Sequence, residues 1–76
     1  MELTLDRLQP DIFCTVTEIR SHEPLRSRLR QFGLIPGTDV CVRYRSPDNG
    51  VTALELRGTV VALRTRELKK IRVRLL

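Results

Sequence analysis

Residues 25–42, LRSRLRQFGLIPGTDVCV, constrain the fold more than any other part of the chain. Leu25, Leu29 and Phe32 recur at helical spacing and give a short helix one apolar side. Gly33 follows the last of these residues, at the position where helices commonly end in a left-handed conformation that glycine adopts without steric cost. The segment therefore predicts a short helix with a defined end.

A tight turn and a strand follow the predicted helix. Leu34 stands where a terminating residue packs back onto the helix. The sequence Ile-Pro-Gly-Thr at 35–38 is typical of a type II turn, because Pro36 presets the second position and Gly37 supplies positive φ at the third. Apolar and polar residues then alternate, which predicts a strand over 40–45.

The rest of the chain consists of short strand-like runs between turn signals. Pro24 suits a first helical position, and Ile12, Cys14 and Val16 share one face of a β-branched run and are expected to point inward. The other predicted elements are an N-terminal lead-in that covers one end of the core (Leu3, Leu5, Leu8), strands over 12–19, 52–57, 59–64 and 71–75, turns at Gly50 and Gly58, and one helical turn over 65–68.

Five short strands, tight turns and one helix predict a mainly β fold. We expect a small SH3-like five-stranded barrel with one short α-helix, in a single domain over residues 1–76. An open β-meander with a helix across it is the alternative. The barrel is favoured because closure removes the exposed edges that an open sheet leaves. The core is expected to be aliphatic, because Phe13, Phe32 and Tyr44 are the only aromatic residues.

The net charge of +5 is unevenly distributed. Residues 1–50 carry seven basic and seven acidic side chains, whereas residues 51–76 carry seven basic and two acidic ones. Such a C-terminal excess indicates an acidic partner: nucleic acid, an anionic membrane surface or an acidic protein face. No aromatic residue lies among these basic side chains, and single-strand nucleic-acid binders use aromatics for stacking, so nucleic acid is the disfavoured partner.

The sequence gives no indication of catalysis, a cofactor or a bound metal. One histidine without paired carboxylates offers no general acid–base machinery. Cys14, His22 and Cys41 have no close ligand spacing, and Cys41 shares strand parity with Arg43 and is expected to be a surface cysteine, whereas Cys14 faces inward. An acidic start and the absence of a long apolar run predict a cytoplasmic protein with reduced thiols and no membrane insertion.

Two motifs in order give the chain a family resemblance. The first is FGLIPGTDV at 32–40, after the leucine-rich helix, and the second is LRGTVVALR at 56–64, followed by Glu67 and the strand near 71–73. Over about residues 3–74 the chain resembles the FeoA family of small cytoplasmic proteins of bacterial ferrous iron uptake. The family usually has Pro-Gly before its first strand, where this chain has Gln-Pro-Asp at 9–11.

The resemblance implies an SH3-like barrel, no catalysis, and action on the membrane transporter FeoB, whose cytoplasmic part carries a GTP-binding domain. At the level of the family it also implies an association with transition metal ions. The C-terminal domains of iron-dependent repressors of the diphtheria-toxin-repressor type are similar to FeoA, so a free-standing relative of such a domain is one alternative. A small basic barrel that binds nucleic acid is the other.

We therefore predict a non-enzymatic cytoplasmic adaptor that regulates ferrous iron uptake through protein–protein contact with a FeoB-type transporter. Weak self-association stays open. An apolar turn beside a charged helix is a reasonable contact patch, and the C-terminal basic residues would speed encounter with an acidic face. The candidate partner-binding residues are Arg28, Leu34, Ile35, Pro36, Arg64, Arg66, Arg72 and Arg74, and the residues expected to serve turns are Gly33, Pro36, Gly37, Gly50 and Gly58.

Overall fold

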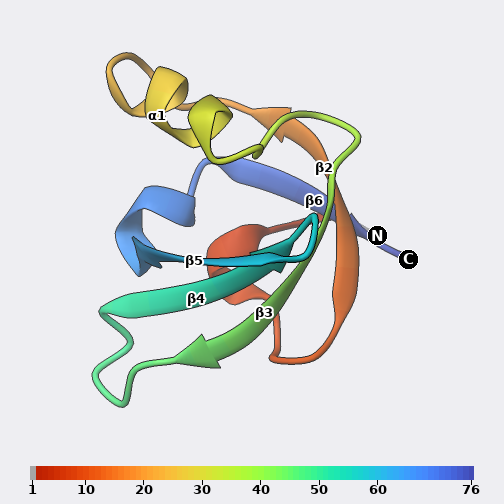
Figure 1. Cartoon of the computed structure of the whole chain (residues 1–76), viewed down its shortest axis with the longest axis vertical. Helices are drawn as coiled ribbons and strands as arrows, with labels where there is room; N and C mark the ends of the chain where they lie inside the picture. Colours follow the sequence, from red (N-terminus) through yellow and green to blue (C-terminus); the bar gives the residue numbers. More distant parts are fainter. Residues whose placement is uncertain (1) are drawn as a thin grey trace.

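The computed structural model describes residues 2–76, and within them the chain forms one antiparallel sheet with one α-helix (Figure 1). The mainly β class predicted from the sequence is confirmed. The elements in chain order are β1 (Glu2–Thr4), the 3-10 turn η1 (Leu5–Arg7), β2 (Phe13–Ile19), α1 (Leu25–Gln31), β3 (Asp39–Arg45), β4 (Val51–Leu56), β5 (Thr59–Arg64), the 3-10 turn η2 (Thr65–Leu68) and β6 (Ile71–Leu75).

The sheet has the strand order β1-β6-β2-β3-β4-β5, so β1 and β5 are its two edges. The 3-10 turn η1 follows the edge strand β1, η2 follows the edge strand β5, and the two turns contact each other. The predicted small SH3-like barrel with one short helix is confirmed, but residues 2–76 supply six strands where the sequence predicted five.

The additional strand comes from the N-terminal lead-in. Leu3 pairs with Val73, so the lead-in extends the sheet as β1 before it turns into η1. Leu5 and Leu8 are buried and cover one end of the core, as predicted. The strand was missed because only three residues of the lead-in pair, which is too short a run for alternation to be recognised.

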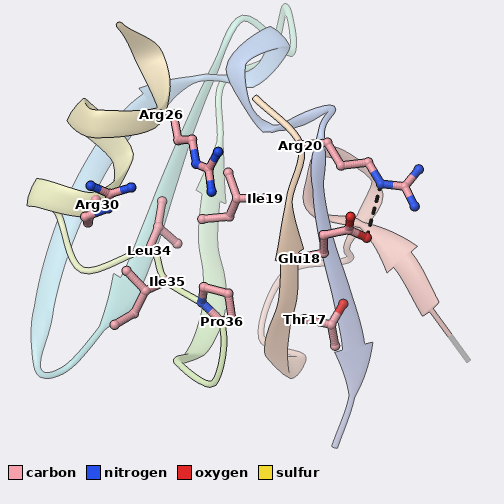
Figure 2. A pocket seen from close by; sticks show the side chains of 9 residues that line it. All are labelled: Thr17, Glu18, Ile19, Arg20, Arg26, Arg30, Leu34, Ile35 and Pro36. Carbon is pink, nitrogen blue, oxygen red and sulfur yellow. Dashed lines mark ion pairs between the residues drawn. The ribbon is translucent and has the colours of Figure 1, made fainter. Parts of the chain in front are cut away.

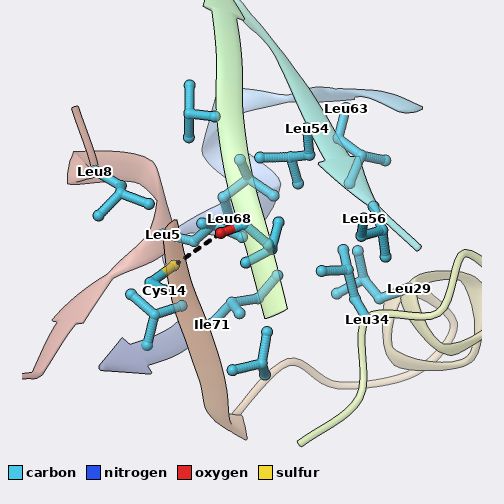
Figure 3. Close-up of a cluster of buried hydrophobic side chains, with 14 residues drawn as sticks. Leu5, Leu8, Cys14, Leu29, Leu34, Leu54, Leu56, Leu63, Leu68 and Ile71 are labelled. Carbon is cyan, nitrogen blue, oxygen red and sulfur yellow. Dashed lines mark hydrogen bonds between the residues drawn. The ribbon is translucent and has the colours of Figure 1, made fainter. Parts of the chain in front are cut away.

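The core is aliphatic, and its leucines come from every part of the chain (Figure 3). Leu29 of α1 and Leu34 of the following turn lie together beside Leu56 of β4, as Figure 3 shows. Burial of each such side chain contributes about 1.5–3 kcal/mol. The buried cluster comprises Leu5, Leu8, Cys14, Val16, Leu29, Leu34, Val40, Val42, Leu54, Leu56, Leu63, Leu68, Ile71 and Val73.

The end of α1 has the predicted geometry. Gly33 adopts φ +93°, its N–H donates to the carbonyl of Arg30 (2.9 Å), and the Leu34 N–H donates to the carbonyl of Leu29 (3.1 Å). These two bonds form a Schellman motif. The type II turn follows, with the Thr38 N–H bound to the Ile35 carbonyl at 3.1 Å and Gly37 at φ +94°. The sequence prediction for this segment is confirmed.

Several element boundaries differ by one residue from the predicted ones: β3 spans Asp39–Arg45 and β4 spans Val51–Leu56, where strands over 40–45 and 52–57 were predicted. The helix begins at Leu25, with Pro24 as its N-cap residue. The first long strand begins at Phe13, and Ile12, which was predicted to face inward, is 42% exposed. The reason lies one residue earlier, where Asp11 has φ +65° and its N–H binds the carbonyl of Val42, so Ile12 belongs to a turn and does not yet alternate with Cys14.

Gly50 and Gly58 lie in the two hairpin loops, as predicted. The first loop is closed by the Ser46 N–H bound to the Val51 carbonyl (2.9 Å). In the second, Arg57 and Gly58 both have positive φ, the pattern of a two-residue type I′ hairpin. Within residues 2–76, no helix is long and apolar enough to span a membrane.

Candidate functional site

A groove of about 390 Å³ lies between α1, the turn that follows it and β2 (Figure 2). We call it the α1–β2 groove. The helix end defined by Gly33 sets its position, because the chain reverses there and brings the turn alongside β2. Its lining residues are Thr17, Glu18, Ile19, Arg20, Arg26, Arg30, Leu34, Ile35 and Pro36.

The apolar part of the α1–β2 groove has a buried base and an accessible wall. Leu34 was predicted to contact a partner, but its side chain is fully buried in the core and contributes only to the base. Its apolar neighbour Ile35 is partly buried, and Pro36 is exposed. The predicted apolar contact is therefore restricted to Ile35 and Pro36.

Two arginines of α1 form the charged wall of the groove. Arg26 and Arg30 stand four residues apart, which places them on the same side of the helix. Both are exposed, and neither makes an ion pair with any residue between 2 and 76. On the opposite wall, Arg20, which directly follows β2, pairs with Glu18 of β2 at 3.1 Å (Figure 2). The groove therefore joins accessible apolar surface to two arginines that make no ion pair within residues 2–76, although both lie within electrostatic range of Glu23.

Arg28 was predicted as a contact residue, but it points to a different side of α1. Its guanidinium binds both carboxylate oxygens of Glu67 in η2, each at 3.2 Å. From the sequence, Arg28 was selected from three arginines of one helix without regard to their spacing. The sequence signal that separates Arg26 and Arg30 from Arg28 is their spacing of four residues. Each of the two directly follows a leucine of the apolar side of the helix, Leu25 or Leu29.

The C-terminal basic residues do not join the α1–β2 groove. Arg64 ends β5 and Arg66 lies in η2. Arg72 lines a separate hollow of about 480 Å³ near Arg7 and Lys69, and Arg74 pairs in register with Thr15. The eight predicted contact residues are thus spread over several surfaces of the barrel, and the α1–β2 groove gathers only Leu34, Ile35 and Pro36 from among them.

Cys14 faces the core, as its strand parity predicted. Its thiol donates to the carbonyl of Val40 at 3.5 Å, and burial raises the pKa of the thiol to about 11. The thiol is therefore protonated at neutral pH and is a poor metal ligand and nucleophile.

Cys41 was predicted to be a surface cysteine, and this is wrong, because its side chain is fully buried. Cys41 does lie on the outer face of the sheet, where its cross-strand neighbours are Phe13 and Glu55. Arg43 bonds Glu55 at 2.6 Å and lies 5.6 Å from the centroid of the Phe13 ring, so it spans both neighbours and covers the thiol.

Arg43 also pairs with Asp11 at 2.9 Å, and its carboxylate partners raise the pKa of this guanidinium. Among residues 2–76, no three histidine, cysteine or acidic side chains are grouped as metal ligands would be.

The FeoA domain model matches residues 3–75, nearly the whole chain. The chain therefore belongs to the FeoA family, as its two motifs indicated. It is similar in structure to an iron uptake regulatory protein (FeoA), with a TM-score of 0.91 and 25% identity over the full length of both chains. No match was found among curated proteins.

Two further solved structures have the same fold. One is iron(II) transport protein A from Clostridium thermocellum, with a TM-score of 0.93 and 22% identity, of which this chain covers 46% while 97% of this chain is matched. The other is a manganese-dependent transcriptional repressor, with a TM-score of 0.89 and 17% identity. The match covers 99% of this chain and 42% of the repressor chain. At these identities the likeness shows the fold alone.

Proposed function

We propose that this protein is a non-enzymatic cytoplasmic adaptor that regulates ferrous iron uptake by binding the cytoplasmic, GTP-binding part of a FeoB-type membrane transporter. Membership of the FeoA family supports the link to iron uptake. The similar full-length structure is that of an iron uptake regulatory protein, which supports a regulatory role.

The observation that carries this proposal is the α1–β2 groove. It combines an accessible apolar turn, Ile35 and Pro36, with two exposed arginines that make no ion pair among the described residues. Such a site suits a protein surface that presents an apolar side chain next to carboxylates. Arginine is well matched to that task because its guanidinium binds carboxylates in a bidentate geometry.

Deletion of the gene in its native host tests the proposal. We expect slower ferrous iron uptake, restored by the wild-type protein and not by a variant with Ile35→Ala, Arg26→Glu and Arg30→Glu. Arg7→Glu with Lys70→Glu is the control for reduced net positive charge, because both residues are exposed and lie outside the α1–β2 groove.

Co-purification with the transporter provides the direct readout. The wild-type protein is expected to co-purify with the transporter at moderate salt after nuclease treatment. Normal uptake in the deletion strain, together with no association with the transporter or its GTP-binding part, would show that the adaptor proposal is wrong. Recovery of a defined nucleic-acid site bound at nanomolar affinity would support the nucleic-acid alternative instead.

A further inference from the structure

We infer that the free edge of strand β5 accepts an extended acidic segment of the protein's partner as an additional strand of the sheet. This inference rests on the proposed function for the identity of the partner, the cytoplasmic part of the transporter. The observations behind it concern a second surface, which shares only Arg30 with the lining of the α1–β2 groove: the unpaired backbone of β5, the groove beside that backbone, and the charges at its two ends.

The backbone of β5 presents unpaired groups along one side. β5 is six residues long and is an edge strand of the sheet, with β4 as its only partner among the described strands. A two-residue hairpin loop makes Leu56 and Thr59 a hydrogen-bonded pair, and such pairs alternate along an antiparallel ladder. The N–H and C=O groups of Val60 and Ala62 therefore point away from β4.

Two hydrogen bonds at the far end of β5 agree with this alternation. The Thr65 N–H donates to the Gly50 carbonyl at 3.0 Å, which continues the paired side of the ladder. The Arg64 N–H instead donates to a carboxylate oxygen of Glu67 at 3.2 Å, so it points away from β4. Glu67 thus covers one end of the edge, and the open stretch is centred on Val60 and Ala62.

A second groove, of about 470 Å³, runs beside this open stretch. Thr59 and Val61 of β5 line one side of it, and Phe32, at the end of α1, lines the other. In Figure 1, β5 is the strand of its hairpin that is nearer to α1. An added strand would therefore place one apolar side chain between Phe32 and Val61 while its backbone pairs with Val60 and Ala62.

The ends of the edge determine the chemistry of the added strand. Arg30 and Arg57 stand by the groove at the hairpin end, and Arg64 ends the strand at the other. All three are exposed and make no ion pair within residues 2–76. Acidic residues flanking the added strand would meet these charges.

The same charges argue against a second copy of this chain as the occupant. Two β5 edges paired in antiparallel fashion would bring Arg57 of one copy close to Arg64 of the other. Like charges placed opposite each other on neighbouring strands are destabilising. The exposed side chains of Val60 (60% exposed) and Ala62 carry no charge that would discourage strand addition. The flanking arginines therefore favour an added strand that carries negative charge.

The test is amide hydrogen exchange of the full chain, alone and with the purified cytoplasmic part of the transporter. We expect binding to slow exchange at the N–H groups of Val60 and Ala62. Ala62→Pro removes one of these donors without breaking a bond to β4, and it is expected to weaken binding about tenfold. Ala62→Ser keeps the donor and is expected to bind as the wild type does.

A second variant keeps the test decisive if Ala62→Pro fails to fold. Arg57→Glu with Arg64→Glu leaves the backbone unchanged and is expected to weaken binding about tenfold or more, whereas the charge-matched control Arg7→Glu with Lys70→Glu weakens it less. Binding without protection of Val60 and Ala62, or undiminished binding by folded Ala62→Pro, would overturn the strand-addition inference and leave the adaptor proposal intact.

Two further results have a clear meaning. Absence of any complex overturns the proposed function, and the inference about its partner falls with it. Dimerisation of the chain alone that Ala62→Pro abolishes, measured by sedimentation, would overturn the assignment of an acidic partner strand.

Discussion

The two sides of α1 use the same residue type in opposite ways. On the side facing η2, Arg28 is held by both oxygens of Glu67. On the side facing the α1–β2 groove, Arg26 and Arg30 are exposed and have no ion pair among the described residues. One side of the helix is bound to the barrel by an ion pair, and the other side carries two exposed arginines without one.

This difference shows that a basic residue count says little about where a partner binds. A surface arginine that already has a carboxylate contributes about 0–1 kcal/mol to stability and has its main interaction satisfied. An unpaired arginine next to apolar surface gains a carboxylate only when a partner supplies one. The predictions that follow test this division, from the largest expected effect to the smallest.

Substitution Gly33→Val tests how firmly the end of α1 is fixed. A β-branched residue at φ +93° is strained, and its side chain would also crowd Leu56 and Arg57, which lie 3.4 Å and 3.7 Å from the position of an added Cβ. We expect a loss of about 2 kcal/mol or more in the free energy of unfolding, measured by urea denaturation.

Gly37 offers the matched control, because it has φ +94° but no atom within 4 Å of an added Cβ. Gly37→Val is therefore expected to suffer the backbone strain without the crowding, and to lose less stability than Gly33→Val. Equal stability of Gly33→Val and the wild type would refute the assigned helix end.

Reversal of Arg26 and Arg30 to glutamate tests the open side of α1. These residues make no ion pair among the described residues but lie within electrostatic range of Glu23, so we expect a small loss of stability and about tenfold weaker binding to the transporter's cytoplasmic part, measured by calorimetry. The Arg7→Glu, Lys70→Glu variant controls for net charge. Binding reduced equally in both variants would mean that long-range charge, and not the groove, is responsible.

Substitution Arg28→Ala tests the side of α1 that is bound to the barrel by an ion pair. The Arg28 side chain is about half exposed, so we expect a loss of no more than about 1 kcal/mol in stability. Partner affinity is expected to stay within twofold, which is roughly 0.4 kcal/mol. A marked loss of affinity without loss of stability would place Arg28 in the contact surface and remove the distinction between the two sides.

The smallest effect is expected at the start of α1, where Glu23 accepts bonds from the N–H (3.0 Å) and hydroxyl (2.6 Å) of Ser27. These bonds lower the pKa of Glu23. A carboxyl group with a lowered folded-state pKa adds stability above its unfolded pKa and loses it as the pH falls through the folded value. Urea titrations should show Glu23→Gln slightly less stable than the wild type at pH 7, with the difference shrinking as the pH falls through the lowered pKa of Glu23.

Local sequence signals predicted the fold well where one residue type determines the backbone. Gly33 and Gly37 fixed the helix end and the turn, and the run from Thr59 to Arg64 after the turn at Gly58 gave β5 its observed bounds. The lead-in strand was not predicted, because its pairing with β6 joins residues at opposite ends of the chain, and no local pattern records such a contact.

The candidate site was predicted less well, because it depends on neighbours that are distant in sequence. Leu34 is a core residue because α1 and β4 surround it, and Cys41 is buried because Arg43 is held over it by Glu55. Arg28 differs from Arg26 only through Glu67, which is thirty-nine positions away. Strand parity gave the correct side of the sheet for each cysteine, but it does not report what covers that side.

Glu67 has a mechanical consequence for the molecule. One carboxylate holds the guanidinium of Arg28 on α1 and also the backbone N–H of Arg64 at the end of β5. A displacement of α1 away from the barrel would therefore disturb the bond of Glu67 to the Arg64 N–H, and a displacement of the β5 end would disturb its bond to Arg28. Glu67 thus connects α1 to the end of β5. The substitution Glu67→Gln keeps the shape of the side chain but removes its charge, and would weaken both bonds.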